Sequence, residues 1–510
     1  MRKFFQTVAI VSVFSVSEKV LGFLYRIYLS HSIGAEGIGL YSVALSVFGL
    51  LYTLCCSGIP ITVSRLMTKY KAQKQPLKVR KIITAGILLP LLFTIPITLV
   101  FFLSGDTFSF LFADRRSFQI FLVILPGLSF TCVYSVLRGV FWGNKDFLPY
   151  SIIELLEEMV MIIVGIILTT YSSSVFQGAF SVGISVLVSY LFSFSLALII
   201  FFIRKNRFSN PASEFKPLIK SAIPVTAMRS ANSFATSLVS IILPLRLISA
   251  GYSKSEAMRS FGAILGQTFP ILSIPTTLIG SFTLVLIPEI SENFYNGRHY
   301  YLKRDVEKAI KISSVVSMLF IPLFLVCGEE MGVIIFGEHQ CGKYLKATAF
   351  LTLFMSLSSL TTSILNSIGL ETKTLTFYVI SSILMLLSIW FLPSVMGIYA
   401  LIVGFSFVFG LTSILNLWLI NKNCAQKPTY FKFMLTAFLT TIPTIIFGFF
   451  LERILLGFLG TVLTLFVCCA LICVFNLLLF FAFGIVSFTK FTIKTKLILK
   501  SKKPQKNAST

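Results

Sequence analysis

Residues 454–486 read ILLGFLGTVLTLFVCCALICVFNLLLFFAFGIV and contain no charged side chain. A helix that crosses a bilayer needs about 20 mostly apolar residues, so this stretch alone predicts a membrane span. The rest of the 510-residue chain is similar, with 56% hydrophobic residues, 12% charged residues and a mean hydropathy of +0.91. Soluble proteins are about 25% charged. We therefore predict an all-α integral membrane protein.

Apolar stretches recur along the whole chain, and together they predict about 14 transmembrane helices. They run over residues 6–30, 40–64, 82–103, 118–141, 149–170, 176–203, 221–245, 261–288, 312–335, 347–369, 376–393, 399–420, 433–451 and 454–486. The intervals between them are short, which excludes an appended ATPase, kinase or DNA-binding domain.

A possible internal repeat predicts the domain organisation. The pairs formed by stretches one and two and by stretches seven and eight both end in a proline and lead into a basic loop, at Gly58-Ile59-Pro60 and at Ile287-Pro288-Glu289. Parallel repeats around a central path are typical of transporters. We expect two six-helix bundles, residues 1–208 and 209–430, then two further transmembrane helices in 431–489 and a basic cytoplasmic tail, 490–510.

The net charge of +24 is distributed unevenly between the two sides of the expected spans. Of 43 Lys and Arg residues, 32 lie at the termini and in alternate loops, eight lie in the other loops and three lie inside spans. Positive charge is retained on the cytoplasmic side. The pattern predicts that both termini are cytoplasmic and that the basic charge serves membrane orientation, with no nucleic-acid partner.

Several charges lie inside the expected spans, where each costs at least about 2.5–3.5 kcal/mol. At 100° per residue, Glu18, Lys19 and Arg26 share one face of the first span. Arg229 lies on a Ser/Thr stripe of the seventh span, with Arg246 just beyond its end. We expect a shared, water-accessible cavity lined with cations. For Glu18, an internal ion pair with Lys19 or Arg26 is the alternative.

A cationic cavity favours an anionic cargo, and arginine matches phosphate geometry in particular. The fifth span carries Glu154, Glu157 and Glu158. These acids could stabilise a helix start, couple transport to an ion, or pair with Arg138. No His, Cys or acidic cluster has the spacing of a metal site.

Prolines in the expected spans predict bends, because proline removes a backbone donor. They could act as hinges of a moving carrier or as static kinks that shape packing. The candidate hinges are Pro60, Pro224, Pro270 and Pro275, with Pro288 as a further bend.

Short motifs in a fixed order resemble a known family. The opening motifs are Lys19-Val-Leu-Gly22-Phe23-Leu-Tyr-Arg26, Gly34-Ala-Glu36-Gly37-Ile-Gly39-Leu40-Tyr41, Gly58-Ile-Pro60 and Ser64-Arg65; later ones are Leu137-Arg138-Gly139-Val-Phe141-Trp-Gly143, Ala222-Ile223-Pro224, Pro270 through Pro275 and Ile287-Pro288-Glu289-Ile290-Ser291. The sequence resembles the polysaccharide flippases related to stage V sporulation protein B, in the MATE-like (MOP) superfamily that also contains lipid II flippases. The resemblance extends over about 400 residues.

This resemblance implies an alternating-access flippase in the bacterial cytoplasmic membrane. It would move an undecaprenyl-diphosphate-linked saccharide, such as lipid II or another cell-envelope precursor, from the inner to the outer leaflet. Arg26 matches the family's first-span arginine, and Lys19 stands where arginine is common. Arg246 and Arg259 fall in a region where the family has basic residues, whereas Arg229 is inferred from its helix face alone.

The resemblance implies no covalent chemistry and no cofactor, so we do not expect an enzyme. A coupling ion, Na⁺ or H⁺, stays open, because no clear counterpart of the acidic sodium site of cation-coupled drug exporters is present. The alternative is a MATE-type antiporter of small molecules or drugs, which would need an acidic, cation-binding cavity. A membrane-embedded glycosyltransferase is a third possibility, but the outward loops are too short for its catalytic acids.

Overall fold

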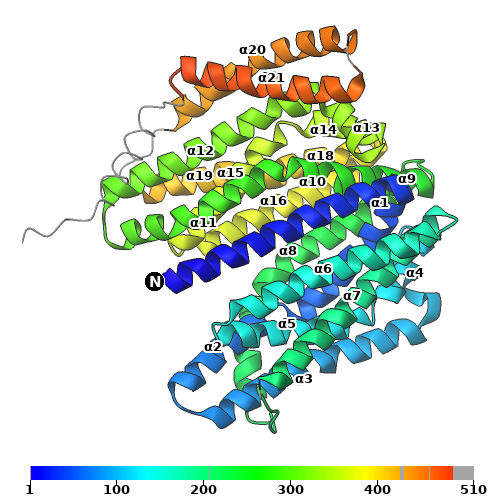
Figure 1. Ribbon diagram of the computed structural model, residues 1–510, viewed down its shortest axis with the longest axis vertical. Helices are drawn as coiled ribbons and strands as arrows, with labels where there is room; N and C mark the ends of the chain where they lie inside the picture. The colour runs from blue at the N-terminus through cyan, green and yellow to red at the C-terminus, as the bar shows by residue number, and fades with distance from the viewer. Residues whose placement is uncertain (1, 205, 425–429, 459, 486–510) are drawn as a thin grey trace, which may run out of the picture. The chain divides into compact units, whose positions relative to one another are not determined.

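The computed structural model describes residues 2–204, 206–424, 430–458 and 460–485. The described residues form helices and contain no β-strand (Figure 1). The chain divides into two compact units, which are described separately below. The expected basic tail, residues 490–510, lies outside the described residues.

The first unit contains the chain up to Ile271 together with Gly332–Tyr344 and Leu375–Val408. The segment that ends at Ile271 contains the helices α1 (Arg2–Cys56), α2 (Ile59–Ala72), α3 (Pro76–Leu103), η1 (Gly105–Leu111), α4 (Arg115–Ile124), α5 (Gly127–Gly143), α6 (Phe147–Thr170), α7 (Val175–Ile203), α8 (Phe215–Ser249), α9 (Lys254–Phe261) and the π-helical turn η2 (Gly262–Thr268). The segment Leu375–Val408 adds most of α16 (Glu371–Phe391), with α17 (Pro393–Met396) and α18 (Tyr399–Phe405).

The second unit contains Leu272–Met331, Leu345–Thr374 and the described chain from Phe409 onward. Its main helices are α11 (Ile274–Tyr295), α12 (His299–Val326), α15 (Leu351–Ser367), α19 (Thr412–Asn423), α20 (Phe431–Leu456) and α21 (Thr461–Ala482). The chain passes between the units in or beside α10 (Phe269–Leu272), α13 (Gly328–Phe336), α14 (His339–Thr348), α16 and the π-helical η3 (Ser406–Leu411).

Each of the fourteen apolar stretches lies on helix in the described residues. By length and composition, eight helices could cross a membrane, or up to eleven if each bent helix pair is one span. The first two expected spans lie mainly in α1, which consists of two helices joined at a kink at Gly34, where φ is +66°. Glycine adopts this left-handed conformation without the cost that a side chain would add. The number fourteen stays a prediction.

Large apolar side chains cover the outside of the long helices. In the first unit, Leu92 of α3 is 63% exposed and Ile199 of α7 is 54% exposed. In the second unit, Ile446 of α20 is 66% exposed and Phe466 of α21 is 68% exposed. Extended apolar surface of this kind marks contact with a membrane or a partner. Together with the helix lengths, it confirms the expected all-α membrane protein.

The part of α1 after Gly34 packs closely against α9 and η2. A Cβ atom on Gly39 would overlap the carbonyl oxygen of Met258, and one on Gly262 would overlap that of Ala35. Two helix backbones can approach this closely only where both lack a side chain. The two glycines therefore set the position of this half of α1 within the first unit.

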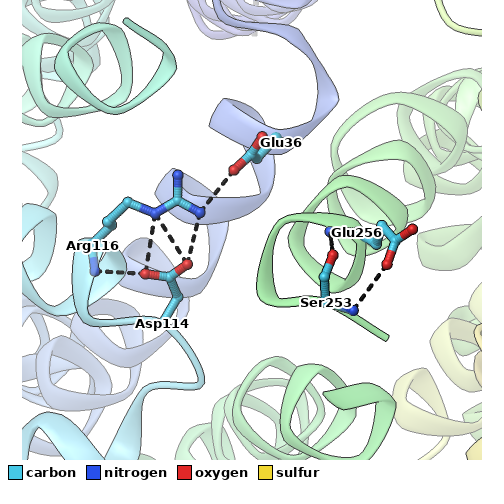
Figure 2. Close-up of polar contacts among 5 residues, drawn as sticks. All are labelled: Glu36, Asp114, Arg116, Ser253 and Glu256. Carbon is cyan, nitrogen blue, oxygen red and sulfur yellow. Dashed lines mark hydrogen bonds and ion pairs between the residues drawn. The ribbon is translucent and has the colours of Figure 1, made fainter. Parts of the chain in front are cut away.

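Charged residues hold the same part of α1 at its start (Figure 2). Arg116 of α4 donates from Nη2 to Glu36 of α1 at 2.7 Å and to Asp114, the residue before α4, at 2.8 Å. Nearby, α9 begins with a capping box, in which the Ser253 hydroxyl accepts from the Glu256 backbone N–H at 3.2 Å. Such contacts satisfy the free N–H groups of a helix start.

Helix α8, from the second expected half, belongs to the first unit because it packs along α1. The first continuous segment of the first unit therefore extends to Ile271, past the expected boundary at residue 208. The two six-helix bundles expected from the internal repeat, 1–208 and 209–430, are defined differently from these compact units, and they stay a prediction.

Candidate functional site

The first unit encloses a cavity of about 460 Å³. Four helices contribute most of its wall: α1 on both sides of Gly34, then α5, α6 and α7. The residues that line it are Glu18, Leu45, Phe48, Gly49, Tyr52, Thr131, Tyr134, Ser135, Arg138, Glu154, Glu157, Glu158 and Tyr190. The wall thus carries four carboxylates and one guanidinium group.

One ion pair crosses this cavity wall. Arg138 of α5 donates from Nη1 to Glu154 Oε1 of α6 at 2.5 Å, and both side chains are about three-quarters buried. The Arg138 guanidinium also lies 5.1 Å from the centre of the Trp142 ring. The sequence left three roles open for Glu154, and the structure shows the pairing with Arg138. Glu154 lies beyond the first turn of α6, so it does not stabilise that helix start.

The other three carboxylates of the cavity form no ion pair with a described basic residue. Among the described residues, no ion pair within 4 Å joins Glu18, Glu157 or Glu158 to a lysine or arginine. Glu157 contacts the Ser193 hydroxyl. The Glu158 carboxylate lies over Gly22 of α1, 2.9 Å from the position of a Cβ atom there. The expected pairing of Glu18 with Lys19 or Arg26 does not form.

Tyrosines complete the wall. The Tyr52 hydroxyl is 2.9 Å from Ser135 Oγ, whereas the Tyr134 hydroxyl has no hydrogen-bond partner among the described residues. Tyr134 is only 4% exposed. An unsatisfied buried hydroxyl costs about 1–3 kcal/mol, so this group is available for a bound molecule.

A second hollow of about 270 Å³ adjoins the first and shares Gly49 and Tyr52 with it. It lies between a Ser/Thr stripe of α1 and the expected Ser/Thr stripe of α8. Thr53 Oγ1 is 2.9 Å from Ser233 Oγ, and Ser237 donates to the Ser46 carbonyl at 2.7 Å. The two stripes therefore face each other and form a neutral, polar extension of the cavity.

The basic residues expected in the site lie elsewhere in the first unit. Lys19, Arg26 and Arg229 are exposed, and none of the five basic candidates lines either hollow. Arg26 donates to the Gly266 carbonyl at 3.3 Å. Arg246 donates to the Trp390 carbonyl at 2.9 Å and stacks over its ring, while Arg259 pairs with Glu338 at 3.0 Å. The structure thus brings together the predicted acids but does not add these cations to them.

Three of the four candidate hinges lie near helix ends. Pro60 and Pro275 stand in the first turns of α2 and α11, where proline costs no hydrogen bond. Pro270 lies in α10, one residue before the end of the first unit at Ile271. Pro224 is in α8, but its side chain lies outside the described residues. The positions fit both hinges and static kinks.

Sequence reasoning did not find Tyr134 or Glu36 as site or supporting residues. Tyr134 is four residues before Arg138 and so shares its helix face, which is the signal that could have found it. Glu36 stands within the Gly34–Tyr41 motif, but its partner Arg116 is 80 residues away in sequence.

Residues 4–294, more than half of the chain, match the model of the family described as polysaccharide biosynthesis protein. The chain belongs to this family. Stage V sporulation protein B of Bacillus subtilis (strain 168) is 24% identical over 346 residues, covering 65% of this chain and 66% of that protein. Lipid II flippase MurJ of the same organism is 23% identical over 333 residues, covering 60% of each chain. The chain therefore spans just under two thirds of these relatives' length.

Solved structures show the fold of this polysaccharide biosynthesis family member. A lipid II flippase MurJ in an inward closed conformation superposes with a TM-score of 0.71 at 16% identity, over 94% of this chain and all of that one. An inward-facing multidrug resistance MATE family transporter of the MOP superfamily gives 0.66 at 14% identity, over 80% and 95%. These likenesses show that the chain shares the fold of these two proteins, and together with the family match they confirm the expected resemblance.

Proposed function

We propose that this protein is a flippase that moves an anionic, lipid-linked saccharide from the inner to the outer leaflet of a bacterial cytoplasmic membrane. The observation that carries the proposal is the family match over residues 4–294, on a chain whose fold resembles a lipid II flippase along 94% of its length. The polar cavity of the first unit supports it, because charged groups inside membrane helices mark a substrate or ion pathway.

Flipping needs no covalent chemistry, only shelter for a polar head while the lipid tail stays in the bilayer. The two contact units supply the two bodies that an alternating-access carrier requires. The chain passes from one to the other between Pro270 and Pro275, so we assign a hinge role to these prolines. The Arg138 pair and the neighbouring acids are assigned to the transport pathway, and the coupling cation, Na⁺ or H⁺, stays open.

Exposed arginines of the first unit are the proposed ligands of the cargo phosphates. Arg229 of α8 is exposed and makes no hydrogen bond or ion pair within the described residues, and Arg26 makes one long bond to a backbone carbonyl. Both guanidinium groups are therefore free to form bidentate bonds with phosphate. Lys19, Arg246 and Arg259 are proposed as secondary contacts, since Arg246 and Arg259 already have partners.

Reconstituted transport tests the proposal directly. Liposomes that contain the purified protein and a fluorescent undecaprenyl-diphosphate saccharide should carry the lipid to the quencher-accessible leaflet faster than empty liposomes. We expect Arg26→Ala and Arg229→Ala each to reduce this rate at least about tenfold, since a charge-assisted phosphate contact contributes about 1.5–3 kcal/mol. Arg80→Ala, which removes an exposed arginine of α3, should leave the rate unchanged.

Membrane insertion is checked in the same samples by the amount of folded protein recovered. Normal transport by both the Arg26 and Arg229 variants would show that these arginines do not bind the cargo phosphates. Equal rates in protein-containing and empty liposomes would contradict the proposal that the protein is a flippase.

One observation favours the MATE-type antiporter as a second candidate: the cavity is acidic, as a cation-binding exporter would require. Melting temperature separates the two. A protein that is stabilised by an organic drug cation but not by undecaprenyl diphosphate is an antiporter, because a ligand stabilises only the state that binds it.

A further inference from the structure

The cavity of the first unit has more negative than positive side chains on its wall. Arg138 neutralises Glu154, and this leaves Glu18, Glu157 and Glu158 around the same 460 Å³ space with no ion pair to a described basic residue. Arg26 and Lys19 are exposed, and neither forms an ion pair with Glu158 or Glu18 within the described residues. Several ionised carboxylates in a low-dielectric site are costly unless a proton or another cation joins them.

The cavity geometry selects among cations. No group of three or more acidic, His or Cys side chains in the described chain lies close enough to coordinate a metal ion. An ammonium group needs no such closed shell. It has three N–H donors on a single nitrogen, which reach separate acceptors at hydrogen-bond distance. Carboxylates on α1 and α6 therefore suit an ammonium group better than a bare metal ion.

The rest of the wall points to the same chemistry. The rings of Phe48 and Tyr190 are stacked, with centroids 5.6 Å apart, and cations bind to aromatic faces. The Tyr134 hydroxyl, on a side chain 96% buried, has no partner and lies on this wall. It is therefore an unused hydrogen-bonding group on a residue of the cavity wall.

We propose that the cavity binds a primary ammonium group on the saccharide part of the transported lipid. The cargo is then zwitterionic: its diphosphate is anionic, and its sugar carries a free amine, as in an unacetylated amino sugar or an attached diamino acid. This inference rests on the proposed flippase function and names the substrate class. The volume fits, since pockets for small molecules span about 300–1,000 Å³.

A matched pair of lipids tests the inference. The probes are undecaprenyl-diphosphate-linked glucosamine and its N-acetyl derivative, which differ in the ammonium group. Binding is measured on the full chain in nanodiscs at neutral pH without sodium. The wild type should bind the free amine at least about tenfold more tightly, which is about 1.4 kcal/mol. Glu18→Gln and Glu157→Gln should each reduce this preference at least threefold, and the double variant should abolish it.

Two further variants test the tyrosine hydroxyl and provide a control. Tyr134→Phe keeps the cavity shape and should lower the preference two- to fivefold. Asp106→Asn, which alters an exposed carboxylate of η1, should leave it unchanged. Unaltered binding of the N-acetyl lipid by the glutamate variants shows that they are folded.

The outcomes separate this inference from the flippase proposal. If both lipids bind equally to the wild type, the ammonium site is wrong and the flippase proposal stands. If neither lipid binds, the flippase proposal fails as well. If the glutamate variants change only a sodium or pH dependence of N-acetyl lipid binding, the carboxylates serve a coupling ion and the inference is overturned.

Discussion

At the scale of single residues, Arg138 and Glu154 form the one direct ion pair on the cavity wall. Their side chains are 25% and 22% exposed, so water screens them little. Removing one member of a buried pair leaves an uncompensated charge, at a cost of about 3–5 kcal/mol. We expect Arg138→Ala to destabilise the protein by about 3 kcal/mol in detergent unfolding experiments, and Arg138→Ala with Glu154→Ala to cost less than the two single changes combined.

The exposed pair of Arg115 and Asp106, 67% and 55% accessible, provides the matched control. A pair in water contributes about 0–1 kcal/mol, so Arg115→Ala should leave the free energy of unfolding nearly unchanged. Equal effects at both pairs would show that water screens Arg138 and Glu154 as strongly as a surface pair, which contradicts their burial.

At the scale of elements, the kinked helix α1 is positioned by the backbone contact with α9 and η2. Gly39→Ala would place a methyl group on the Met258 carbonyl, and the helices would have to separate. Overpacking costs about 1–3 kcal/mol, and we expect the upper end of that range because the obstacle is backbone. The melting temperature of the purified protein measures it.

Gly49, on the same helix, is the control for this change. Its Cβ position has no heavy atom within 4 Å, and alanine is favoured over glycine in a helix by roughly 0.5–1 kcal/mol. Gly49→Ala should therefore raise the melting temperature slightly. If Gly39→Ala is equally harmless, α1 and α9 are not in backbone contact.

At the scale of the whole molecule, the charge distribution predicts the orientation. We expect a fluorescent protein fused after the C-terminus to be fluorescent, because this reporter folds in the cytoplasm. Gly251 lies in a loop that the charge distribution places outside the cytoplasm, so alkaline phosphatase fused after it should be active. A fusion after Gln75, in a basic loop expected in the cytoplasm, should be inactive. The reverse pattern would invert the proposed direction of transport.

Much of the fold could be predicted because hydrophobicity is a local property. Most of each apolar stretch between residues 6 and 486 lies on helix where it is described, and the expected Ser/Thr stripe of α8 does contact α1. The break between the first two expected spans was also predictable, because Gly34, where the chain kinks, lies in the short interval between them.

The candidate site was predictable only in part. Helical periodicity groups residues on one face of one helix, so it found Glu18 with Arg26 and Glu154 with Glu157. It does not say which faces of different helices meet. For this reason the partner of Glu154, on α5, and the role of Tyr134 could not be chosen from sequence.

The amino-acid sequence by itself determined that this chain is helical and embedded in a membrane, because those properties follow from sums over its side chains. Only the tertiary structure decided that the cavity of the first unit is acidic. The sign of its charge depends on which faces of α1, α5 and α6 pack together, and each of these helices carries more than one face that could have been turned inward.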